Sequence, residues 1–384
     1  MKEINSIITS FVDNQHNNEE LFLATVVNVQ GSTYRQPGAR MLITSSGKIM
    51  GTISGGCLEN DVIEHTRLMT TDEKAKIITY DTNAEEDIIW GFGLGCNGVV
   101  DILIERIYHD DPLNPLGFIH QCLSHQQPGI IASVFSVSGN INVSLGAHLT
   151  LNSDGFVNSN ISEPVINNAL IKDAALVLKN QSSSFHKYQL SSGEVSVFIE
   201  LIQPPPNLMI FGAGRDAIPL AEFAKALGWK VTIFDCRALE LSKERFIMAD
   251  EIILTRRDIL PQQLSVNANS LAVVMTHNYF DDLAILKLLI PVNIKYLGCL
   301  GSKQRIAKLL TDVQEAMGEF NPEKLAKFYA PVGLDIGADT PETIALSIIA
   351  EIQTILKNRT GGFLKHRTKP INQRNEIKEI EINN

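Results

Sequence analysis

Short runs of alternating apolar and polar residues fill the first half of the chain, and this alternation is typical of half-buried β-strands. The expected strands cover residues 21–29, 39–44, 48–53, 75–80, 99–107, 129–137 and 147–151. Helical spacing of apolar residues accompanies them at residues 4–14, 60–69, 116–123 and 164–178, and a β-ribbon is expected over residues 185–200. Strands and helices mixed in this way predict an N-terminal α+β domain.

The second half of the chain changes to short, mostly apolar runs that alternate with helices. The expected strands cover residues 208–211, 231–234, 251–254, 272–276 and 294–300, and the expected helices cover residues 219–227, 281–289, 302–317 and 341–356. Such alternation predicts a parallel sheet with helices on both faces. The fold class is therefore α/β, with a C-terminal Rossmann-like, doubly wound parallel sheet and an N-terminal mixed α+β domain.

A run of three prolines, Pro204 to Pro206, separates the two halves. Proline lacks a backbone N–H and favours an extended, stiff chain, so the run predicts a domain boundary. The expected domains are residues 1–203 and the Rossmann-like residues 207–360. Residues 361–384 end in alternating charges and amides without an apolar face, and we expect a flexible tail there.

The stretch LMIFGAGRDAIPLAEFAKALGWKVTIFD, residues 208–235, joins the first two strands of the second domain. Strand, G-x-G-x-x-A turn, helix, strand and acid follow in the order of a dinucleotide-binding unit. Gly212 permits the tight turn, and Gly214 lets backbone N–H groups approach a pyrophosphate. Asp235 ends the second strand, where it can accept hydrogen bonds from a ribose. The stretch predicts binding of NAD(P) or another nucleotide, although such turns also persist as scaffold.

Two glycine-rich loops in the first domain each contain a cysteine. Gly55, Gly56 and Cys57 precede the helix expected at residues 60–69, where the helix dipole favours a thiolate and the neighbouring Glu59 opposes it. Gly95 and Cys96 lie in the segment WGFGLGCNG. Glycines at this density let the backbone approach a ligand, but glycine turns with buried cysteines are an equally simple explanation. A zinc site is not expected, because the chain has no C-x-x-C pair and no His cluster near these loops.

Three further side chains are candidate ligand contacts. Arg35 and Arg40 flank a proline–glycine turn, and two guanidinium groups at this spacing suit a phosphate, although surface ion pairs also explain them. His277 follows the strand expected at residues 272–276. Because strand ends line the ligand crevice of a doubly wound sheet, His277 is expected to face the site, as an acid/base catalyst or as a packing residue.

Composition and charge argue against nucleic-acid-binding, membrane-spanning and disulfide-rich secreted proteins. The 384 residues carry a formal net charge of −10 and no long basic block, which argues against a nucleic-acid partner. No run approaches the roughly 20 apolar residues of a membrane span, and the first residues do not have a signal-peptide pattern. Five scattered cysteines do not suggest a disulfide framework. We therefore expect a cytoplasmic protein with reduced thiols and no membrane partner.

Seven segments within residues 15–105 and 205–357 resemble the XdhC/CoxI family, accessory proteins that mature xanthine dehydrogenase and related molybdenum hydroxylases. They read ATVVNVQGSTYRQPGARM, GTISGGCLEND, GFGLGCNGVVDILIE, IFGAGRDAIPLAEFAKALGWKVTIFD, VVMTHNYFDD, LGCLGSKQR and PVGLDIGADTPETIALSI. The chain departs from the family's usual pattern at Asn97, in a loop that usually reads GCGG. It departs again at Arg215, where a His usually follows the GAG turn, and Arg215 adds a cation where an anionic ligand would lie.

The resemblance implies a chaperone that binds the molybdenum cofactor, molybdopterin with its metal. Such a protein protects the cofactor while a cysteine desulfurase supplies the sulfido ligand, and inserts it into an apo-hydroxylase resembling xanthine dehydrogenase. Because molybdenum is thiophilic, Cys57 or Cys96 suits a transient metal ligand. The phosphate tail of the cofactor suits the glycine loops, Arg35 and Arg40. We also expect a homo-oligomer.

Two alternatives belong to other classes. The first is an NAD(P)-dependent oxidoreductase that uses the Rossmann crevice with His277 as acid/base, and the second is a docking scaffold whose Rossmann site is vestigial. The chaperone, without turnover of its own, is favoured over the oxidoreductase. No second acid/base group is evident beside His277, and the domain with the two glycine–cysteine loops has no role in simple hydride transfer.

Overall fold

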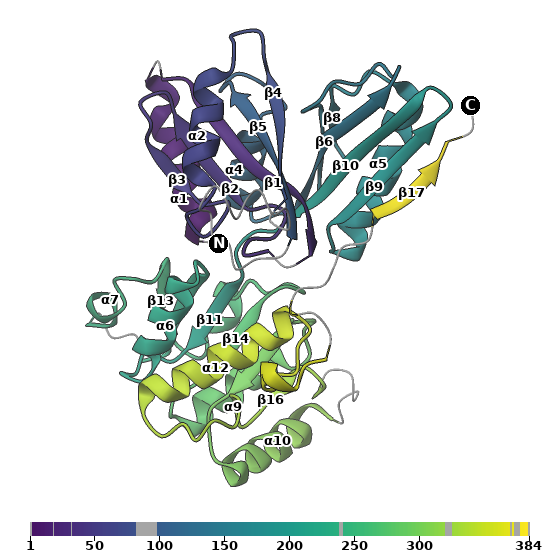
Figure 1. The fold of residues 1–384 in the computed structure, drawn as a ribbon. Coiled ribbons are helices and arrows are strands. Elements are labelled where there is room, and N and C mark those ends of the chain that lie inside the picture. Colours follow the sequence, from purple (N-terminus) through teal and green to yellow (C-terminus); the bar gives the residue numbers. More distant parts are fainter. Residues whose placement is uncertain are drawn as a thin grey trace. The chain divides into compact units, whose positions relative to one another are not determined.

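The computed structural model describes residues 2–17, 19–31, 33–81, 98–237, 241–318, 325–368, 371 and 377–382. The chain folds into two compact units (Figure 1). The N-terminal unit comprises Glu3–Pro204 and the last residues, Pro370–Asn384. The Rossmann unit comprises Pro205–Lys369 together with Met1–Lys2. The main crossing from the first unit to the second lies within the proline run.

The first sheet of the N-terminal unit is antiparallel and has the order β3-β2-β1-β5-β4. Its strands are β1 (Leu21–Gly31), β2 (Arg40–Thr44), β3 (Ile49–Gly51), β4 (Ala75–Asp81) and β5 (Gly98–Ile107), with the helices α1 (Lys2–Asp13), η1 (Asn14–His16) and α2 (Glu59–Leu68). Successive side chains of β1 point to opposite faces. Leu21 and Leu23 pack with α1, whereas Phe22 and Ala24 pack in the cluster that contains Val62 of α2. Both faces are covered, which explains why β1 is buried along most of its length.

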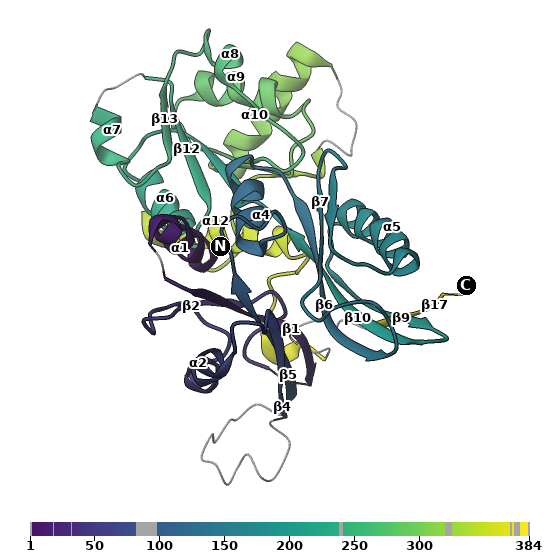
Figure 2. The same ribbon diagram turned by 90° about the horizontal axis from the view of Figure 1, so that it is seen from above.

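The second sheet of this unit has the order β17-β9-β10-β6-β7-β8. Its strands are β6 (Gly129–Gly139), β7 (His148–Asn152), β8 (Val157–Ser159), β9 (Ser184–Leu190), β10 (Gly193–Ile202) and β17 (Ile377–Glu381), and the helices are α4 (Pro115–Ser124) and α5 (Pro164–Asn180). β17 pairs in parallel with the edge strand β9 (Figure 2). The structure therefore differs from the tail expected over residues 361–384. Ile380 packs against the core cluster that contains the buried residues of α5. The composition of the tail did not suggest this apolar contact.

Two buried ion pairs join the two sheets of the N-terminal unit. Arg40 of β2 donates two hydrogen bonds to Glu200 of β10. His148 Nε2 of β7 lies 2.6 Å from Glu105 Oε1 of β5. Burial would lower the pKa of His148, but the Glu105 carboxylate outweighs burial and raises it. Buried charges that are paired in this way fix which strands face each other across the interface.

The Rossmann unit contains one all-parallel sheet of order β13-β12-β11-β14-β15-β16. The strands are β11 (Asn207–Phe211), β12 (Lys230–Asp235), β13 (Glu251–Leu254), β14 (Leu271–Val274), β15 (Tyr296–Cys299) and β16 (Phe328–Tyr329). In chain order this is 3-2-1-4-5-6, the order of Rossmann dinucleotide-binding domains. The predicted fold class is confirmed. The strand order reverses between β11 and β14, and ligands of such sheets bind at this switch point.

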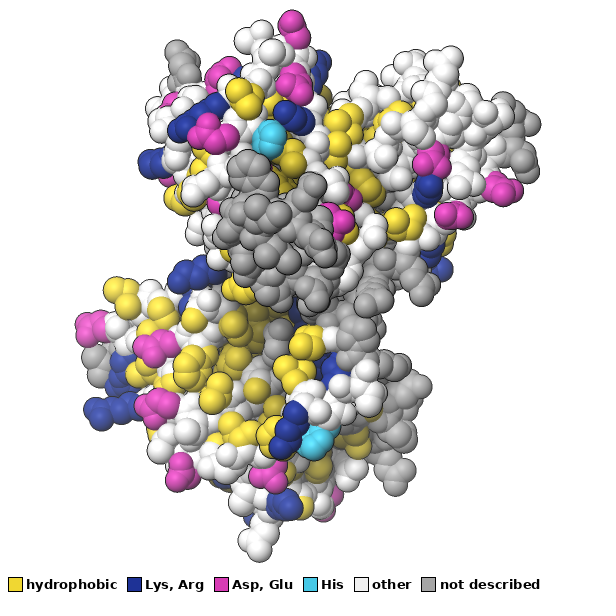
Figure 3. All heavy atoms as spheres, viewed as in Figure 1, with side chains coloured by type: hydrophobic (Ala, Val, Ile, Leu, Met, Phe, Trp, Pro, Cys, Tyr) yellow, Lys and Arg dark blue, Asp and Glu magenta, His cyan; other side chains and the backbone are white. Residues whose placement is uncertain are grey.

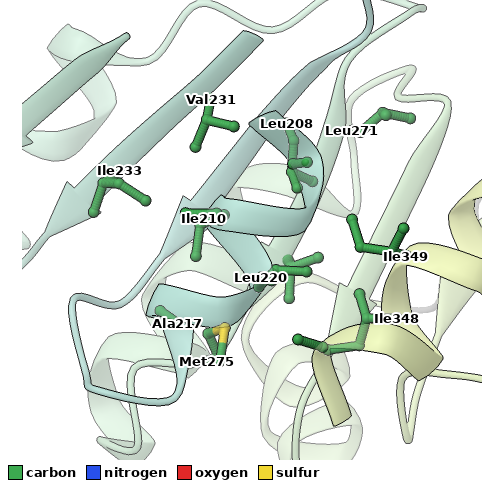
Figure 4. Packing of buried hydrophobic residues seen from close by; sticks show 14 of the residues in the cluster. Leu208, Ile210, Ala217, Leu220, Val231, Ile233, Leu271, Met275, Ile348 and Ile349 are labelled. Atoms are coloured by element: carbon green, nitrogen blue, oxygen red, sulfur yellow. The ribbon is translucent and has the colours of Figure 1, made fainter. Parts of the chain in front are cut away.

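Helices cover both faces of the parallel sheet. The helices of this unit are α6 (Ala217–Ala226), α7 (Leu241–Arg245), α8 (Leu260–Gln263), α9 (Tyr279–Leu289), α10 (Lys303–Met317), α12 (Pro341–Leu356) and η2 (Leu364–His366). Helices α6 and α12 pack on one face of the sheet, and α9 and α10 pack on the other. Ile210 of β11 packs with Leu220 of α6 and Ile348 of α12 on one face (Figure 4). The next residue, Phe211, packs on the other face with Ile285 of α9. Within the described ranges, no helix combines the length and apolar character needed to cross a membrane.

The Arg40–Glu200 pair yields a stability prediction. Glu200→Gln removes the carboxylate that pairs directly with the Arg40 guanidinium, which is 5% exposed, so we expect a loss of about 3 kcal/mol in the free energy of unfolding. Urea denaturation followed by circular dichroism measures the loss. Glu194→Gln is the matched control, because Glu194 lies on the same strand and pairs with Lys187 in a solvent-exposed contact. Equal effects of the two substitutions would contradict a structural role of the buried pair.

Candidate functional site

The Gly–Cys loop, residues 52–58, connects β3 to α2 and places Cys57 two residues before the helix begins. The Cys57 side chain is half-buried. Gly56 has φ +107°, and a Cβ added there would meet no atom, so this glycine is needed for its backbone conformation. A Cβ at Gly55 would lie 3.8 Å from the ring of Tyr34, which is 71% exposed. The loop thus places a thiol beside two residues without side chains.

Glu59, the first residue of α2, holds the loop in place. Its carboxylate is buried, and Oε1 accepts hydrogen bonds from the Ile53 N–H (3.2 Å), the Ser54 N–H (2.9 Å) and the Thr52 hydroxyl. Oε2 accepts a hydrogen bond from the Ser54 hydroxyl. Burial alone would raise the pKa of Glu59, but the hydrogen bonds from Ser54 and Thr52 outweigh it and lower the pKa below its ordinary value. Glu59 is therefore a buried, ionised anchor for the loop.

Ser54 transmits this anchoring to the cysteine. Its Oγ accepts the N–H groups of Gly56 (3.1 Å), Cys57 (3.0 Å) and Leu58 (3.1 Å) while it donates to Glu59. The backbone on both sides of Cys57 is consequently fixed by one hydroxyl group. These three N–H groups already donate hydrogen bonds to Ser54 Oγ within the loop. The thiol is therefore the group of the segment that can react with a ligand.

A cavity of about 480 Å³ lies beside Cys57. Its walls are formed by Cys57 of the Gly–Cys loop, by Gly47 of the β2–β3 turn and by five residues of α2, which are Asn60, Asp61, Ile63, Glu64 and Arg67. Arg67 pairs with Glu64, and Asp61 accepts a hydrogen bond from the Tyr80 hydroxyl (2.6 Å). The cavity is in the size range of small-molecule sites, and its walls carry both signs of charge. In the part of the chain that the structure describes, no group of three His, Cys, Asp or Glu side chains is arranged to hold a metal ion. Of the residues that line this cavity, Cys57 is the one that carries a thiol.

Arg35 is brought close to the Gly–Cys loop, although it was predicted from a separate segment. Its guanidinium pairs with Glu3 Oε2, and Oε1 of the same carboxylate accepts the Thr52 N–H (2.7 Å). Arg40, in contrast, is buried and engaged by Glu200, so its guanidinium does not face a ligand site. Gly95 and Cys96 lie outside the described residues. The structure thus groups Arg35, Gly55, Gly56 and Cys57.

The switch-point turn, residues 212–216, connects β11 to α6 in the Rossmann unit. Gly212 has φ +130°, and a Cβ there would clash with the carbonyl oxygen of Met275. Arg215 is exposed. His277 lies beside the turn with φ +59°, and its Nε2 is 2.6 Å from Asp216 Oδ2. Gly212, Gly214, Arg215 and His277 are therefore neighbours at the carboxyl ends of β11 and β14, the edge on which the sequence placed them.

Asp235 ends β12 as expected, but its carboxylate is turned into the protein. It is 1% exposed. Oδ1 accepts the N–H of Arg237 (3.0 Å), and Oδ2 accepts the Ser242 hydroxyl (2.6 Å). Both oxygens already stabilise the segment that follows β12, so a ribose would have to compete with the protein's own donors.

A second cavity, of about 320 Å³, lies at the carboxyl ends of β14 and β15. Met275, His277, Leu300, Gly301 and Arg305 line it. The Arg305 guanidinium donates to the buried Asp282 (2.7 Å) and lies over the Tyr279 ring. His277 therefore faces a cavity, and Asp216, which reasoning from the sequence did not single out, is its partner.

Sequence reasoning also missed Ser54 and Glu59. Two hydroxyl residues before a helix and an acid in its first turn were visible in the segment TISGGCLE. Glutamates in first helical turns are common, however, and their ordinary role is to face the helix dipole from solvent. Only the burial of Glu59 reveals its role as an anchor.

Comparison with known proteins identifies the family. The XdhC and CoxI family matches residues 15–81, and the XdhC Rossmann domain matches residues 208–352. A Bacillus subtilis (strain 168) protein, named as one probable subunit of xanthine dehydrogenase, is 32% identical over 352 residues, which cover 92% of this chain and 97% of that protein. The Escherichia coli (strain K12) molybdenum cofactor insertion chaperone PaoD is 22% identical over 334 residues, 87% of this chain and 82% of PaoD.

A solved structure agrees with these matches. The crystal structure of a protein from Bacillus halodurans, named as a xanthine dehydrogenase, superimposes with a TM-score of 0.73 at 26% identity and covers 92% of this chain and 97% of that chain. The resemblance inferred from the seven sequence segments is confirmed: the chain belongs to the XdhC and CoxI family.

Proposed function

We propose that this protein is an accessory chaperone that binds the molybdenum cofactor and inserts it into a molybdenum hydroxylase of the xanthine dehydrogenase type. The observation that carries the proposal is Cys57, a half-buried thiol in a glycine loop that opens on a cavity of about 480 Å³. The names of two relatives, a molybdenum cofactor insertion chaperone and a probable xanthine dehydrogenase component, support the same role. The cofactor is cargo here, held and then released.

The residues around Cys57 suit this cargo chemically. A thiolate is a soft ligand and suits the thiophilic metal as a transient, single contact. Gly55 and Gly56 add no side chains of their own beside the sulfur, and the space next to Gly56 is open. Arg35 and Arg67 carry positive charge near the loop and the cavity, and a guanidinium that exchanges its carboxylate partner for a phosphate keeps a charge-assisted hydrogen bond.

The later steps are part of the same proposal. The bound cofactor is protected until a cysteine desulfurase supplies the sulfido ligand, and it then passes to the apo-hydroxylase in the cytoplasm. A second copy of the chain is expected to associate through the Rossmann unit, where apolar side chains gather over α6 and α12 (Figure 3). Three exposed apolar side chains lie there: Phe223 on α6, Leu227 directly after α6, and Leu346 on α12.

Glu59 acts on the cargo through Cys57 and is therefore a positioning residue. Its carboxylate fixes Ser54, and Ser54 fixes the backbone at Cys57. Without the carboxylate, the Ser54 hydroxyl and two N–H groups lose their acceptor, and the thiol is no longer held over the cavity. A metal contact made by one ligand depends strongly on such preorganisation.

Cys57→Ala tests the proposed metal contact. The substitution removes the only thiol near the cavity among the described residues and little packing, so folding should persist while retained molybdenum falls at least fivefold. Elemental analysis of protein purified from a molybdopterin-producing host measures the metal, and activation of a co-expressed apo-hydroxylase measures delivery. Cys122→Ala is the control, because Cys122 is buried in the core around α4. If Cys57→Ala and Cys96→Ala both retain wild-type molybdenum and activation, the thiol contact does not exist.

Glu59→Gln tests the anchor. The folded pKa of Glu59 lies below its ordinary 4.5, so its stabilisation is fully present above that pH and is lost as the pH falls through the lower folded value. Near neutral pH we expect the substitution to cost about 2 kcal/mol in the free energy of unfolding, and the difference from wild type should shrink below pH 4.5.

Urea denaturation between pH 3 and pH 7 measures this difference. Molybdenum content of the folded variant is the second readout, and it should fall with Glu59→Gln. Asp72→Asn, which changes an exposed acid just beyond α2, should change neither. A pH-independent cost with unchanged molybdenum would show that Glu59 is a simple packing residue.

A further inference from the structure

The switch-point turn contains an acid at the place where its sequence motif predicts an anion. Asp216 is the fifth residue of the G-x-G-x-x-A turn and directly precedes α6. A Cβ added to Gly214 would clash with Asp216 Oδ1. In this motif the second glycine is small so that a ligand's pyrophosphate can approach the backbone. In this protein the carboxylate oxygen of Asp216 fills the space that Gly214 leaves open.

His277 holds the carboxylate in this position. Its Nε2 lies 2.6 Å from Asp216 Oδ2, and its Cδ2 would lie 3.8 Å from a Cβ at Gly214. The φ of +59° at His277 is unusual for a residue with a side chain, and such conformations persist only where the surrounding structure enforces them. The turn holds the backbone before His277 in place, because Gly212 packs directly against the carbonyl of Met275.

Two arginines near the turn are engaged by groups other than Asp216. Arg305 lines the same cavity as His277 but is paired with Asp282. Arg245 donates to the carbonyl oxygen of Ala213 (3.3 Å). Arg215 is exposed at the surface. The Asp216 side chain is 22% exposed and that of His277 61%, so a ligand that arrives at the turn can contact this pair as well as Arg215.

The second acid of the dinucleotide motif also has its hydrogen bonds supplied by the protein itself. Asp235, the acid expected to bind a ribose, accepts hydrogen bonds from Ser242 and from the Arg237 N–H. Two positions that would normally face a dinucleotide are thus occupied by the chain's own groups. Because both acids are paired within the chain, we infer that the protein's own side chains occupy the positions that a dinucleotide would use.

We propose that Asp216 is a specificity-determining residue that excludes phosphate from the Rossmann unit. Its carboxylate, held by His277, takes the place of a ligand phosphate. A dinucleotide would have to bring its negative charge into contact with this carboxylate or displace it from His277, and like charges in contact weaken binding strongly. The protein therefore keeps the Rossmann fold while discriminating against NAD(P) and other nucleotide phosphates.

Binding titrations of the purified full-length chain with NADH, ADP and adenosine test the proposal. Asp216→Asn removes the charge, and Asp216→Ala also empties the space above Gly214. Both should bind NADH and ADP at least tenfold more tightly than wild type, with Asp216→Ala gaining at least as much as Asp216→Asn. Affinity for adenosine, which has no phosphate, should not change. Thermal unfolding followed by circular dichroism checks that each variant is folded.

Two further variants serve as controls. Glu222→Gln removes one negative charge from an exposed position on the same helix and should leave NADH affinity unchanged. His277→Gln keeps the carboxylate but removes the imidazole that holds it over Gly214, so it should raise NADH affinity by less than Asp216→Asn does. Three results would overturn the proposal: wild type binding NADH as tightly as Asp216→Asn, equal gains from Asp216→Asn and Glu222→Gln, or no NADH binding by any folded Asp216 variant.

Discussion

A carboxylate removed from water must be supplied with hydrogen bonds or a countercharge, and this requirement organises both units of the protein. Glu59 meets it with donors from its own loop, and thereby fixes the segment that presents Cys57. Glu105 and Glu200 meet it with His148 and Arg40 across two sheets. Asp235 meets it with the segment that follows its strand. In each case the partner of the carboxylate decides which parts of the chain are held together.

The two units differ in what they offer a ligand. The N-terminal unit has a thiol beside two glycines and a cavity, and buried hydrogen bonds hold the loop that contains the thiol. The Rossmann unit has the fold of a dinucleotide-binding domain, yet its turn contains Asp216 paired with His277. This division is consistent with the proposed carrier of a molybdenum cofactor, in which the proposed metal contact is the Cys57 sulfur and the Rossmann unit transfers no hydride.

Most of the fold was accessible from the sequence. The strands β1, β5 and β6 and the helices α5 and α12 lie within a few residues of their predicted positions, because apolar periodicity reports burial directly. The parallel sheet of the Rossmann unit followed from its alternation of strands and helices. The strand β17 was not foreseen, because five mostly exposed residues of alternating charge become a strand only when a free sheet edge is present.

The sequence by itself determined the fold class, the family and the segment that contains Cys57, since these depend on patterns between neighbours along the chain. The tertiary structure decided which charged residues are free to meet a ligand. Arg40 is paired with a residue 160 positions away, and Asp216 with one 61 positions away. Hydrogen bonds and ion pairs act over a few ångströms, and only folding determines which distant residues come that close.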